Sequence, residues 1–210
     1  NGNIKSANFR FIYHRDKKKA LAEDLIEILK KFDSAVHYSI YEDKKSKTNC
    51  LTFYSTVLAK EILKYCGAAK NKFLSQELLL MEKEKQMELL KSWFLTDGSG
   101  HWLKTGASIC TAEENLGLSL IFLLQRNRLT YSIGRVPPKE NVKFPNGTYN
   151  TKGAYVIYFH TPGLGDHLKY DGQYIISRIY DIRRNFYKGE VFNFEVKDKN
   201  EYLADNVLVH

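Results

Sequence analysis

The sequence predicts an α+β protein in which a strand–helix–strand–strand unit occurs twice and is followed by an all-β C-terminal segment. In two stretches of the chain, runs with strand-like alternation and runs with a helical apolar stripe follow one another in the same order. The tripeptide Tyr38–Ile40 recurs as Tyr131–Ile133, an offset of 93 that favours an ancient duplication. The region after Tyr170 has no helical stripe and contains three strand-like runs: Tyr174–Tyr180, Glu190–Val196 and Val207–Val209.

The first unit is predicted to begin with a strand at Asn8–His14, where apolar and polar residues alternate. From Asp16 the apolar residues take a helical spacing and form one stripe: Leu21, Leu25, Ile28, Leu29 and Phe32. Two further strands are expected at Ala35–Tyr41 and Asn49–Tyr54, on either side of a lysine-rich polar loop.

Three helices are predicted between the two units. The first, Thr56–Cys66, ends at Gly67, a residue suited to a helix C-terminus. A short helix follows at Gln76–Met81. The third is Lys83–Asp97, with an apolar stripe formed by Met87, Leu90 and Phe94.

The second unit repeats the order of the first. A strand is predicted at Gly106–Cys110, and Thr111–Glu114 (Thr-Ala-Glu-Glu) has the pattern of a capping box that begins a helix. The apolar run Leu116–Leu124 continues that helix. Strands follow at Leu129–Val136 and Ala154–His160, and the Pro-, Gly- and Asn-rich stretch between them is expected to be a loop.

Composition limits the class of protein. The chain has 210 residues, of which 43% are hydrophobic and 27% charged, so it can bury a core, and disorder, collagen-like repeats and disulfide scaffolds are excluded. No run of about 18 apolar residues occurs, so we expect no membrane partner. The three cysteines are odd in number and far apart, which favours buried thiols in an intracellular, reducing compartment. The first residue is Asn1 and no leader follows it, which suggests a piece of a longer protein.

The positive charge is concentrated in the first 166 residues. They contain 25 of the 32 Lys and Arg residues and 17 of the 24 acids, which accounts for the net charge of +8, whereas seven bases and seven acids balance after residue 166. A basic body with a neutral tail suggests two functional parts, of which the first attracts a polyanion. Ordinary solubility charge is an alternative that composition leaves open.

Asp97 is an unusual residue for the end of a helix. The helix dipole presents partial negative charge there and disfavours an acid by about 0.3–1 kcal/mol. A divalent cation would reverse the sign of that interaction, because carboxylate and carbonyl oxygens are both hard ligands. The alternative that Asp97-Gly98 only makes a turn stays open at this point.

The segment Leu90–Gly98, an apolar helix that ends in Thr-Asp-Gly, resembles the signature helix of LAGLIDADG homing endonucleases, and the units around it resemble that family's saddle-shaped halves. The resemblance implies that two such helices pack side by side and that their terminal acids hold divalent metal, expected to be Mg²⁺, for phosphodiester hydrolysis. It also implies that the strands lie along the major groove of double-stranded DNA. The first signature helix would precede Asn1, so the metal role carries over only to Asp97.

Strand positions that are candidates for groove contacts divide between phosphate neutralisation and contacts to base edges. They are Arg10, Tyr13, His37, Ser39, Ser132 and Arg135. The face of each strand that meets DNA cannot be read from the sequence.

The C-terminus carries a second motif. Glu190–Val196, then the acidic and polar run to Tyr202, then Val207–His210, resemble the C-terminal splicing region of an intein, which implies an all-β Hint fold. His210 matches the penultimate histidine that assists cyclisation of a final asparagine, a step that needs no cofactor. That asparagine and the extein nucleophile are absent from this sequence. Asn193 and Asn200 stand at catalytic positions where the family usually has Asp and often has His.

The combined interpretation is the C-terminal portion of an endonuclease-containing intein. Residues 1–164 form a LAGLIDADG homing endonuclease domain that lacks its first signature helix, and 165–210 form the C-terminal part of the Hint protein-splicing domain. Its expected partners are double-stranded DNA, a complementary N-terminal intein segment, as in a split intein, and the host extein protein. The alternatives are a degenerate nucleic-acid-binding module and a free-standing homing endonuclease or maturase without splicing activity.

Overall fold

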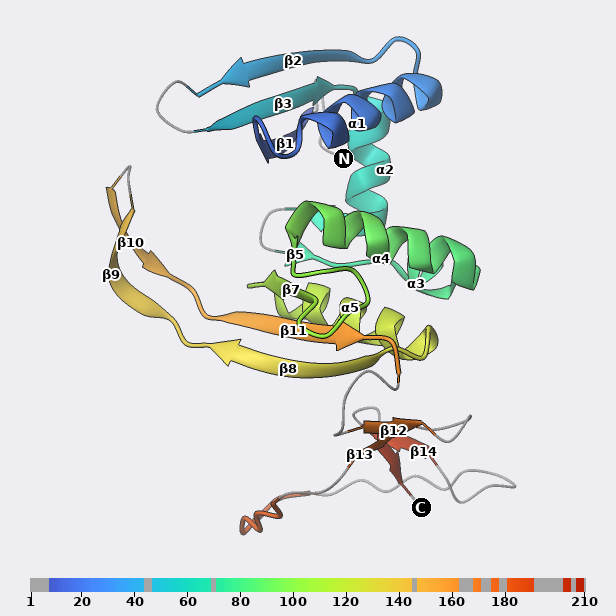
Figure 1. Cartoon of the computed structure of the whole chain (residues 1–210), viewed down its shortest axis with the longest axis vertical. Coiled ribbons are helices and arrows are strands. Elements are labelled where there is room, and N and C mark those ends of the chain that lie inside the picture. Colours follow the sequence, from blue (N-terminus) through green and yellow to red (C-terminus); the bar gives the residue numbers. More distant parts are fainter. Residues whose placement is uncertain are drawn as a thin grey trace. The chain divides into compact units, whose positions relative to one another are not determined.

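The computed structural model describes residues 8–43, 47–68, 71–144, 147–162, 168–170, 175–177, 181–190, 202–204 and 207–209. The chain divides into two compact units, Asn1–Ser177 and Arg178–His210. The first unit contains two sheets that each pack against helices (Figure 1).

The first sheet consists of β1 (Asn8–His14), β2 (His37–Glu42) and β3 (Thr48–Tyr54), antiparallel in the order β1-β3-β2. Helices α1 (Lys19–Phe32) and α2 (Thr56–Cys66) contribute apolar side chains to one face of this sheet. The residues buried in that core are Tyr13, Ala22, Val36, Leu51, Phe53 and Leu58.

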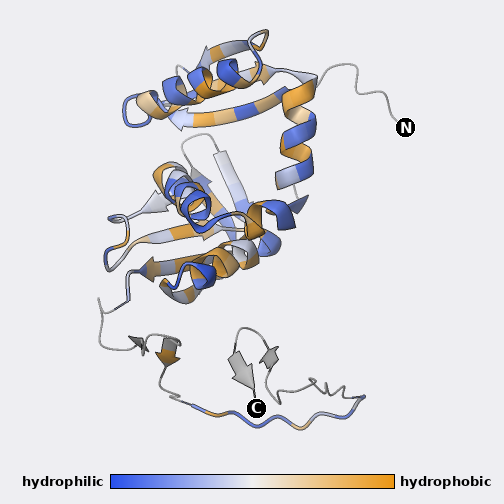
Figure 2. Ribbon diagram, turned by 90° about the vertical axis from the view of Figure 1, so that its right-hand side faces the viewer, coloured by the Kyte–Doolittle hydropathy of each residue, from blue (hydrophilic) through white to orange (hydrophobic). Residues whose placement is uncertain are grey.

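The second sheet has the order β6-β7-β11-β8 and is also antiparallel. Its strands are β6 (Gly98–Ser99), β7 (Ser108–Thr111), β8 (Thr130–Val136) and β11 (Ala154–His160). Helix α5 (Glu114–Arg126) packs on one face, where Ile109, Ile157 and Phe159 are fully buried. Figure 2 shows hydrophilic and hydrophobic residues alternating along α2, whose two ends contribute to the two cores through Leu58 and Cys66.

Helices α3 (Gln76–Leu80) and α4 (Lys83–Asp97) belong to the second core. Gln86 is fully buried and donates hydrogen bonds to the carbonyls of Leu79 and Met81, both at 2.8 Å. The side-chain amide of Asn127 donates to Gln86 Oε1 at 2.9 Å. This polar network ties α3 and α4 to the C-terminal end of α5.

Four two-stranded sheets complete the described structure. Each is an antiparallel pair, and their strands are β4 (Gly67–Ala68) with β5 (Asn71–Lys72), β9 (Lys139–Phe144) with β10 (Gly147–Thr151), β12 (Leu168–Tyr170) with β13 (Ile175–Ser177), and β14 (Tyr202–Ala204) with β15 (Val207–Val209).

The repeat expected from the sequence is present in the structure, because β1-β3-β2 and β7-β11-β8 have the same order, and a helix connects β1 to β2 in the first half and β7 to β8 in the second. In each half, the Tyr of the repeated tripeptide pairs with a fully buried Phe and the Ile with a fully buried aliphatic residue. These pairs are Tyr38 with Phe53, Tyr131 with Phe159, Ile40 with Leu51 and Ile133 with Ile157. The short sequence repeat therefore marks equivalent places in two sheets.

Two predictions about helix ends were wrong. Helix α1 begins at Lys19 rather than Asp16, because the backbone N–H groups of Asp16 and Lys17 donate to His14 Nδ1 and hold a turn there. The capping box at Thr111–Glu114 does not form. Thr111 is held in β7 by pairing with Tyr155, its hydroxyl accepts from the Glu113 N–H at 3.1 Å, and the helix begins at Glu114.

Two further expectations also need correction. The stretch between β8 and β11 is a hairpin, β9–β10, rather than a loop. The apolar stripe of α1 is only partly buried, since 59% of Ile28 and 62% of Phe32 are exposed. No helix among the described residues covers these two side chains, whereas α3 and α4 cover the corresponding side of α5.

All three cysteines are free thiols, but they are not buried as expected: Cys110 is exposed, and Cys50 and Cys66 are half-buried. Burial raises the pKa of the Cys66 thiol above its ordinary value. Burial also raises the pKa of the Tyr131 hydroxyl, against the opposite effect of a hydrogen bond from Gln125 at 2.9 Å.

The described residues after 167 are strands or irregular segments, which include the predicted Val207–Val209 and the part of Tyr174–Tyr180 that forms β13. The predicted strand Glu190–Val196 falls almost wholly outside the described residues. In the described part of the chain no helix combines the length and the apolar character that a membrane span requires.

Candidate nucleic-acid interface

The first sheet has one face covered by helices and one open face. Directly paired residues lie on the same face, so the register places Arg10, Thr52 and Ser39 in one row across the three strands of the open face. Neighbouring rows on this face add polar and aromatic side chains together with the exposed aliphatic Ile12: Asn8, Tyr54, His37, Ile12, Cys50 and Tyr41. Arg10 is exposed and makes no hydrogen bond or ion pair within the described residues. The open face therefore offers a free guanidinium beside hydrogen-bonding side chains.

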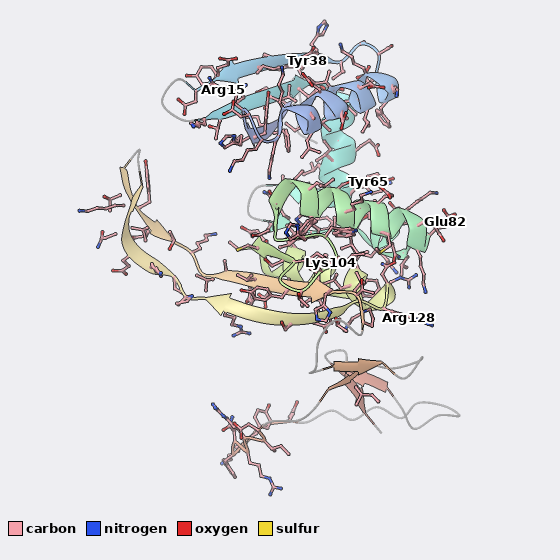
Figure 3. The ribbon with its side chains drawn as sticks, in the orientation of Figure 1. Arg15, Tyr38, Tyr65, Glu82, Lys104 and Arg128 are labelled. Atoms are coloured by element: carbon pink, nitrogen blue, oxygen red, sulfur yellow. The ribbon has the colours of Figure 1, made fainter. Side chains whose placement is uncertain are left out.

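Arg15, which follows β1, is differently placed. Its Nε donates to Asn49 Oδ1 at 3.2 Å, one terminal nitrogen donates to the Asp43 carbonyl at 3.1 Å, and Glu42 lies 3.9 Å away (Figure 3). Its charge is thus engaged within the sheet, and Arg10 is the free arginine of this half in the described structure.

Two of the candidate groove residues do not lie on the open faces of the sheets. Tyr13 is buried under the helices, with 5% of its surface exposed, and its hydroxyl accepts from the Asn49 amide at 3.4 Å. Arg135 lies on the face covered by α5, where its guanidinium carbon is 5.6 Å from the centre of the Tyr155 ring. Arg10, His37 and Ser39 share the open face of the first sheet, and Ser132 lies on the open face of the second.

The open face of the second sheet carries no lysine or arginine at its paired positions. Its rows consist of small, polar or aromatic side chains: Ser99, Ser108, Cys110, Thr130, Ser132, Gly134, Val136, Ala154, Val156, Tyr158 and His160. The β9–β10 hairpin adds three lysines to this half.

The β9–β10 hairpin continues from β8 and β11 and curves away from the sheet (Figure 1). It has Lys139 and Lys143 on β9, and Lys152 follows β10; all three are exposed. Asn141 has a positive φ of 54° and its N–H donates to Asn150 Oδ1 at 2.9 Å, next to a shift in strand register. A two-stranded ribbon of this kind has no core of its own, and its width suits the major groove of B-DNA.

Asp97 is the last residue of α4, as the sequence predicts, and its side chain is exposed. The helix end beneath it is fixed by an aromatic cluster of Phe94, Trp102 and Phe159, with ring centres 5.4–5.9 Å apart. Leu90, one turn earlier, is fully buried. The carboxylate is thus presented to solvent from a rigid support.

Gly98 permits the sharp exit from this helix. A Cβ atom at this position would lie 2.3 Å from the Phe94 ring and 2.4 Å from the Phe94 carbonyl oxygen, distances that no side chain tolerates. The Gly98 N–H donates to that same carbonyl, and the chain then pairs as β6 with β7. Glycine is required here for close approach.

The donor set for a divalent cation is incomplete. Among the described residues no group of three or more His, Cys, Asp or Glu side chains is arranged to hold a metal ion. One exposed carboxylate at a helix end does not by itself fix Mg²⁺, which prefers octahedral oxygen ligation. The predicted splicing residues His210, Asn193 and Asn200 lie outside the described residues.

Comparison with known proteins gives one sequence relative and a set of similar structures. No family model matches the chain. The sequence is 23% identical over 215 residues to the uncharacterized protein MJ0043 of Methanocaldococcus jannaschii, an alignment that covers 93% of this chain and 26% of that protein. The chain therefore spans about a quarter of the length of this curated relative.

Among solved structures, the crystal structure of I-DmoI in complex with DNA and Ca has a TM-score of 0.50 and 12% sequence identity, and the match covers 73% of this chain and 69% of that one. A structure of mesophilic variants of the homing endonuclease I-DmoI matches with a TM-score of 0.49 and 12% identity over 73% of both chains. At this identity the likeness concerns the fold: the duplicated unit has the architecture of a homing endonuclease.

Proposed function

We propose that the chain binds double-stranded DNA site-specifically, with the open faces of its two sheets and the β9–β10 hairpin in contact with the duplex. The observation that carries this proposal is the open face of the first sheet, where Arg10 makes no ion pair or hydrogen bond within the described residues and lies in one row with the exposed Ser39; Thr52, between them, is 7% exposed. Arginine neutralises phosphates or reads guanine, and hydroxyl groups contact phosphates and base edges. The homing-endonuclease fold and the net charge of +8 support the same function.

DNA cleavage requires more metal-binding carboxylates than the described residues supply. Asp97 provides one carboxylate, and hydrolysis of a phosphodiester commonly uses metal ions held between carboxylates. The exposed Ile28 and Phe32 of α1 provide a seat for a helix equivalent to α4, which would bring a second terminal acid. We infer that cleavage with Mg²⁺ depends on a second carboxylate that the described residues do not bring to Asp97.

The binding proposal is tested by selecting sequences from a library of random DNA duplexes with the whole 210-residue chain. Affinity for a selected duplex is then measured by fluorescence anisotropy at several salt concentrations. We expect binding that weakens steeply with salt and prefers the selected sequence over a scrambled one. Failure to enrich any sequence, with no salt-dependent binding, would refute the proposal.

Cleavage is tested on the selected duplex with Mg²⁺, using a protein extended at its N-terminus by a helix that ends in an acid and packs on Ile28 and Phe32. We expect the extended protein to cut and its Asp97→Asn variant to bind without cutting. If neither protein cuts, the degenerate binding module becomes the better description.

We also propose that the C-terminal residues take part in protein splicing inside the cell. The support is the sequence from Glu190 to His210, which resembles the C-terminal splicing region of inteins. In that role His210 would hydrogen-bond the scissile carbonyl while a following asparagine cyclises. The Hint domain would be completed by an N-terminal intein segment, since separate strands leave edges to be paired.

The splicing proposal is tested by adding the terminal Asn and an extein nucleophile and mixing the chain with an N-terminal intein fragment. We expect a ligated product, and expect its formation to fall sharply in His210→Ala. No ligation in the presence of a fragment that binds would favour a free-standing endonuclease or maturase.

A further inference from the structure

Helix α5 carries an exposed stripe that neither the DNA-binding face nor Asp97 explains. Glu114, Leu118, Phe122 and Arg126 follow one another at intervals of four, so they lie along one side of the helix. Leu118 is 56% exposed and Phe122 is 36% exposed. The stripe is apolar in its middle and charged at both ends.

The equivalent helix of the first half is a built-in comparison. Residues 19–23 of α1 and 114–118 of α5 have the same pattern of burial at an offset of 95, with Ala22 and Gly117 as the buried small residues. The stripe of α1 at that offset is entirely charged, and consists of Lys19, Glu23, Glu27 and Lys31. Lys19 pairs with Glu23 at 3.6 Å, and Lys31 pairs with Glu27 at 2.6 Å. The fold therefore accepts a solvated stripe at this place, and the apolar middle of the α5 stripe is a property of the second half alone.

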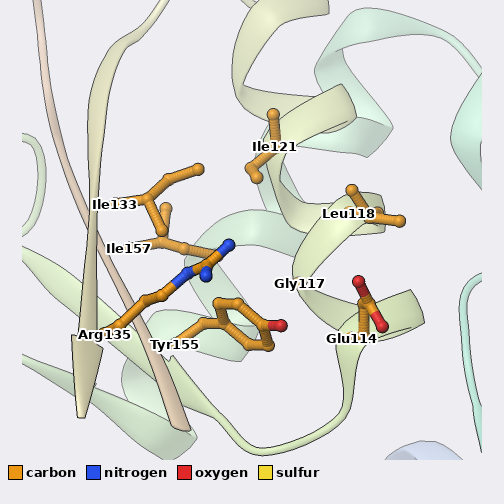
Figure 4. Close-up of a pocket in the computed structure, with 8 residues that line it drawn as sticks. All are labelled: Glu114, Gly117, Leu118, Ile121, Ile133, Arg135, Tyr155 and Ile157. Atoms are coloured by element: carbon orange, nitrogen blue, oxygen red, sulfur yellow. The ribbon is translucent and has the colours of Figure 1, made fainter. Parts of the chain in front are cut away.

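A groove runs beside the apolar middle of this stripe. It encloses about 140 Å³ between α5 and the strands β8 and β11, and Leu118, Ile121, Ile133 and Ile157 form its apolar walls (Figure 4). Ile133 is itself 48% exposed. The groove can accept an apolar side chain from a partner that lies along α5.

The two charges at the ends of the stripe are unpaired. Within the described residues neither Glu114 nor Arg126 makes an ion pair. The Arg126 guanidinium lies 5.8 Å from the centre of the Phe122 ring, and its Nε is buried without a hydrogen-bond partner in that part of the chain. The two residues are twelve positions apart, about 18 Å along the helix.

We propose that this surface binds a second copy of the chain, with the two α5 helices antiparallel about a two-fold axis at Leu120. The sequence positions are self-complementary under that operation, because Glu114 meets Arg126 of the partner subunit and Leu118 meets Phe122 of the partner subunit. Each Phe122 ring enters the groove beside Leu118 on the other copy. Charge complementarity favours a second copy as the partner, because two antiparallel stripes place the acid of each copy opposite the base of the other.

The test is the oligomeric state of the whole 210-residue chain in solution, measured by sedimentation equilibrium over a range of concentrations. We expect a reversible dimer. Glu114→Arg or Arg126→Glu alone places like charges opposite each other at two points in the symmetric dimer, so we expect roughly tenfold weaker association for each variant. The double variant Glu114→Arg/Arg126→Glu restores opposite charges and should dimerise within about threefold of the parent.

Two further variants keep the proposal falsifiable if a charge variant unfolds. Leu118→Lys should abolish the dimer, whereas Ile28→Lys, at the exposed apolar site of α1, should leave it intact. A monomer at every concentration overturns the proposal, as does a dimer that Ile28→Lys dissolves and Leu118→Lys does not. Binding of a different protein with no self-association would assign the surface to another partner and would equally overturn it. None of these results depends on DNA binding.

Discussion

The two halves of the first unit have the same strand order, and Leu51 and Phe53 of one sheet match Ile157 and Phe159 of the other as fully buried residues, yet among the described residues helices cover α5 and not α1. In the second half, α3 and α4 pack against α5, so Leu123 is fully buried. Ile28, which occupies the matching position of α1, is 59% exposed. Neighbouring elements therefore decide which residues are buried in each half of this duplicated fold. The apolar pattern of α1 is suited to a covering helix that the described residues do not supply.

The largest change in the free energy of unfolding is expected when the matching residues Leu123 and Ile28 are each shortened to alanine. Leu123→Ala should lower the free energy of unfolding by about 2–5 kcal/mol, because it removes a fully buried side chain and leaves a cavity. Ile28→Ala should change it by less than about 0.5 kcal/mol, because most of that side chain is in water. Urea unfolding followed by circular dichroism measures both. Equal losses would mean that α1 is covered in solution and would remove the contrast.

The next prediction concerns the polar network that anchors α4 in the second half. Gln86→Leu removes two donated hydrogen bonds and the acceptor for Asn127, so the carbonyls of Leu79 and Met81 lose their partner. We expect a loss of about 2 kcal/mol in the free energy of unfolding, since each unsatisfied buried group costs about 1–3 kcal/mol.

The neighbouring substitution Lys85→Ala is the matched control for the network. It breaks only an exposed ion pair with Glu82, so we expect a change below about 0.5 kcal/mol. If the two variants have the same stability, the network does not hold α4.

The third prediction compares one residue type on two faces. Arg10→Ala should weaken duplex binding several-fold and reduce the slope of log affinity against log salt by about one, as expected for the loss of one phosphate contact. Arg135→Ala removes the same charge from the helix-covered face of the other sheet and should leave affinity and slope near those of the parent. Anisotropy titrations at three or more salt concentrations measure both quantities. Equal losses of affinity and of slope in the two variants would show that each positive charge contributes to binding regardless of the sheet face on which it lies.

Much of the fold could be predicted from the sequence where the signal is local. The predicted bounds of α2, α4 and β11 agree residue for residue with the structure, because a clear stripe or alternation ends at a glycine, an acid–glycine turn or a loop. The repeat was also visible, since Tyr38–Ile40 and Tyr131–Ile133 occupy the same register positions.

The β9–β10 hairpin was missed because none of its strand residues with a described burial is fully buried, and strand recognition depends on an apolar face. The available signal was the dipeptide Asn146-Gly147, which favours a tight hairpin turn. The face of each groove candidate could not be predicted either, since it depends on strand register. Asp97 was placed correctly because it ends a strong helix, whereas the part played by His210 stays a prediction.

The last prediction concerns the stability that Tyr131 contributes at high pH, where we expect only a small change. Burial raises the pKa of Tyr131 above the ordinary value of about 10, so the folded state holds its proton more tightly than the unfolded state. The stabilisation is therefore present below about pH 10 and is lost as the pH rises through the folded-state pKa. The midpoint of urea unfolding should fall less between pH 9 and pH 11 in Tyr131→Phe than in the parent. An identical fall in Tyr131→Phe and in the parent would contradict the prediction.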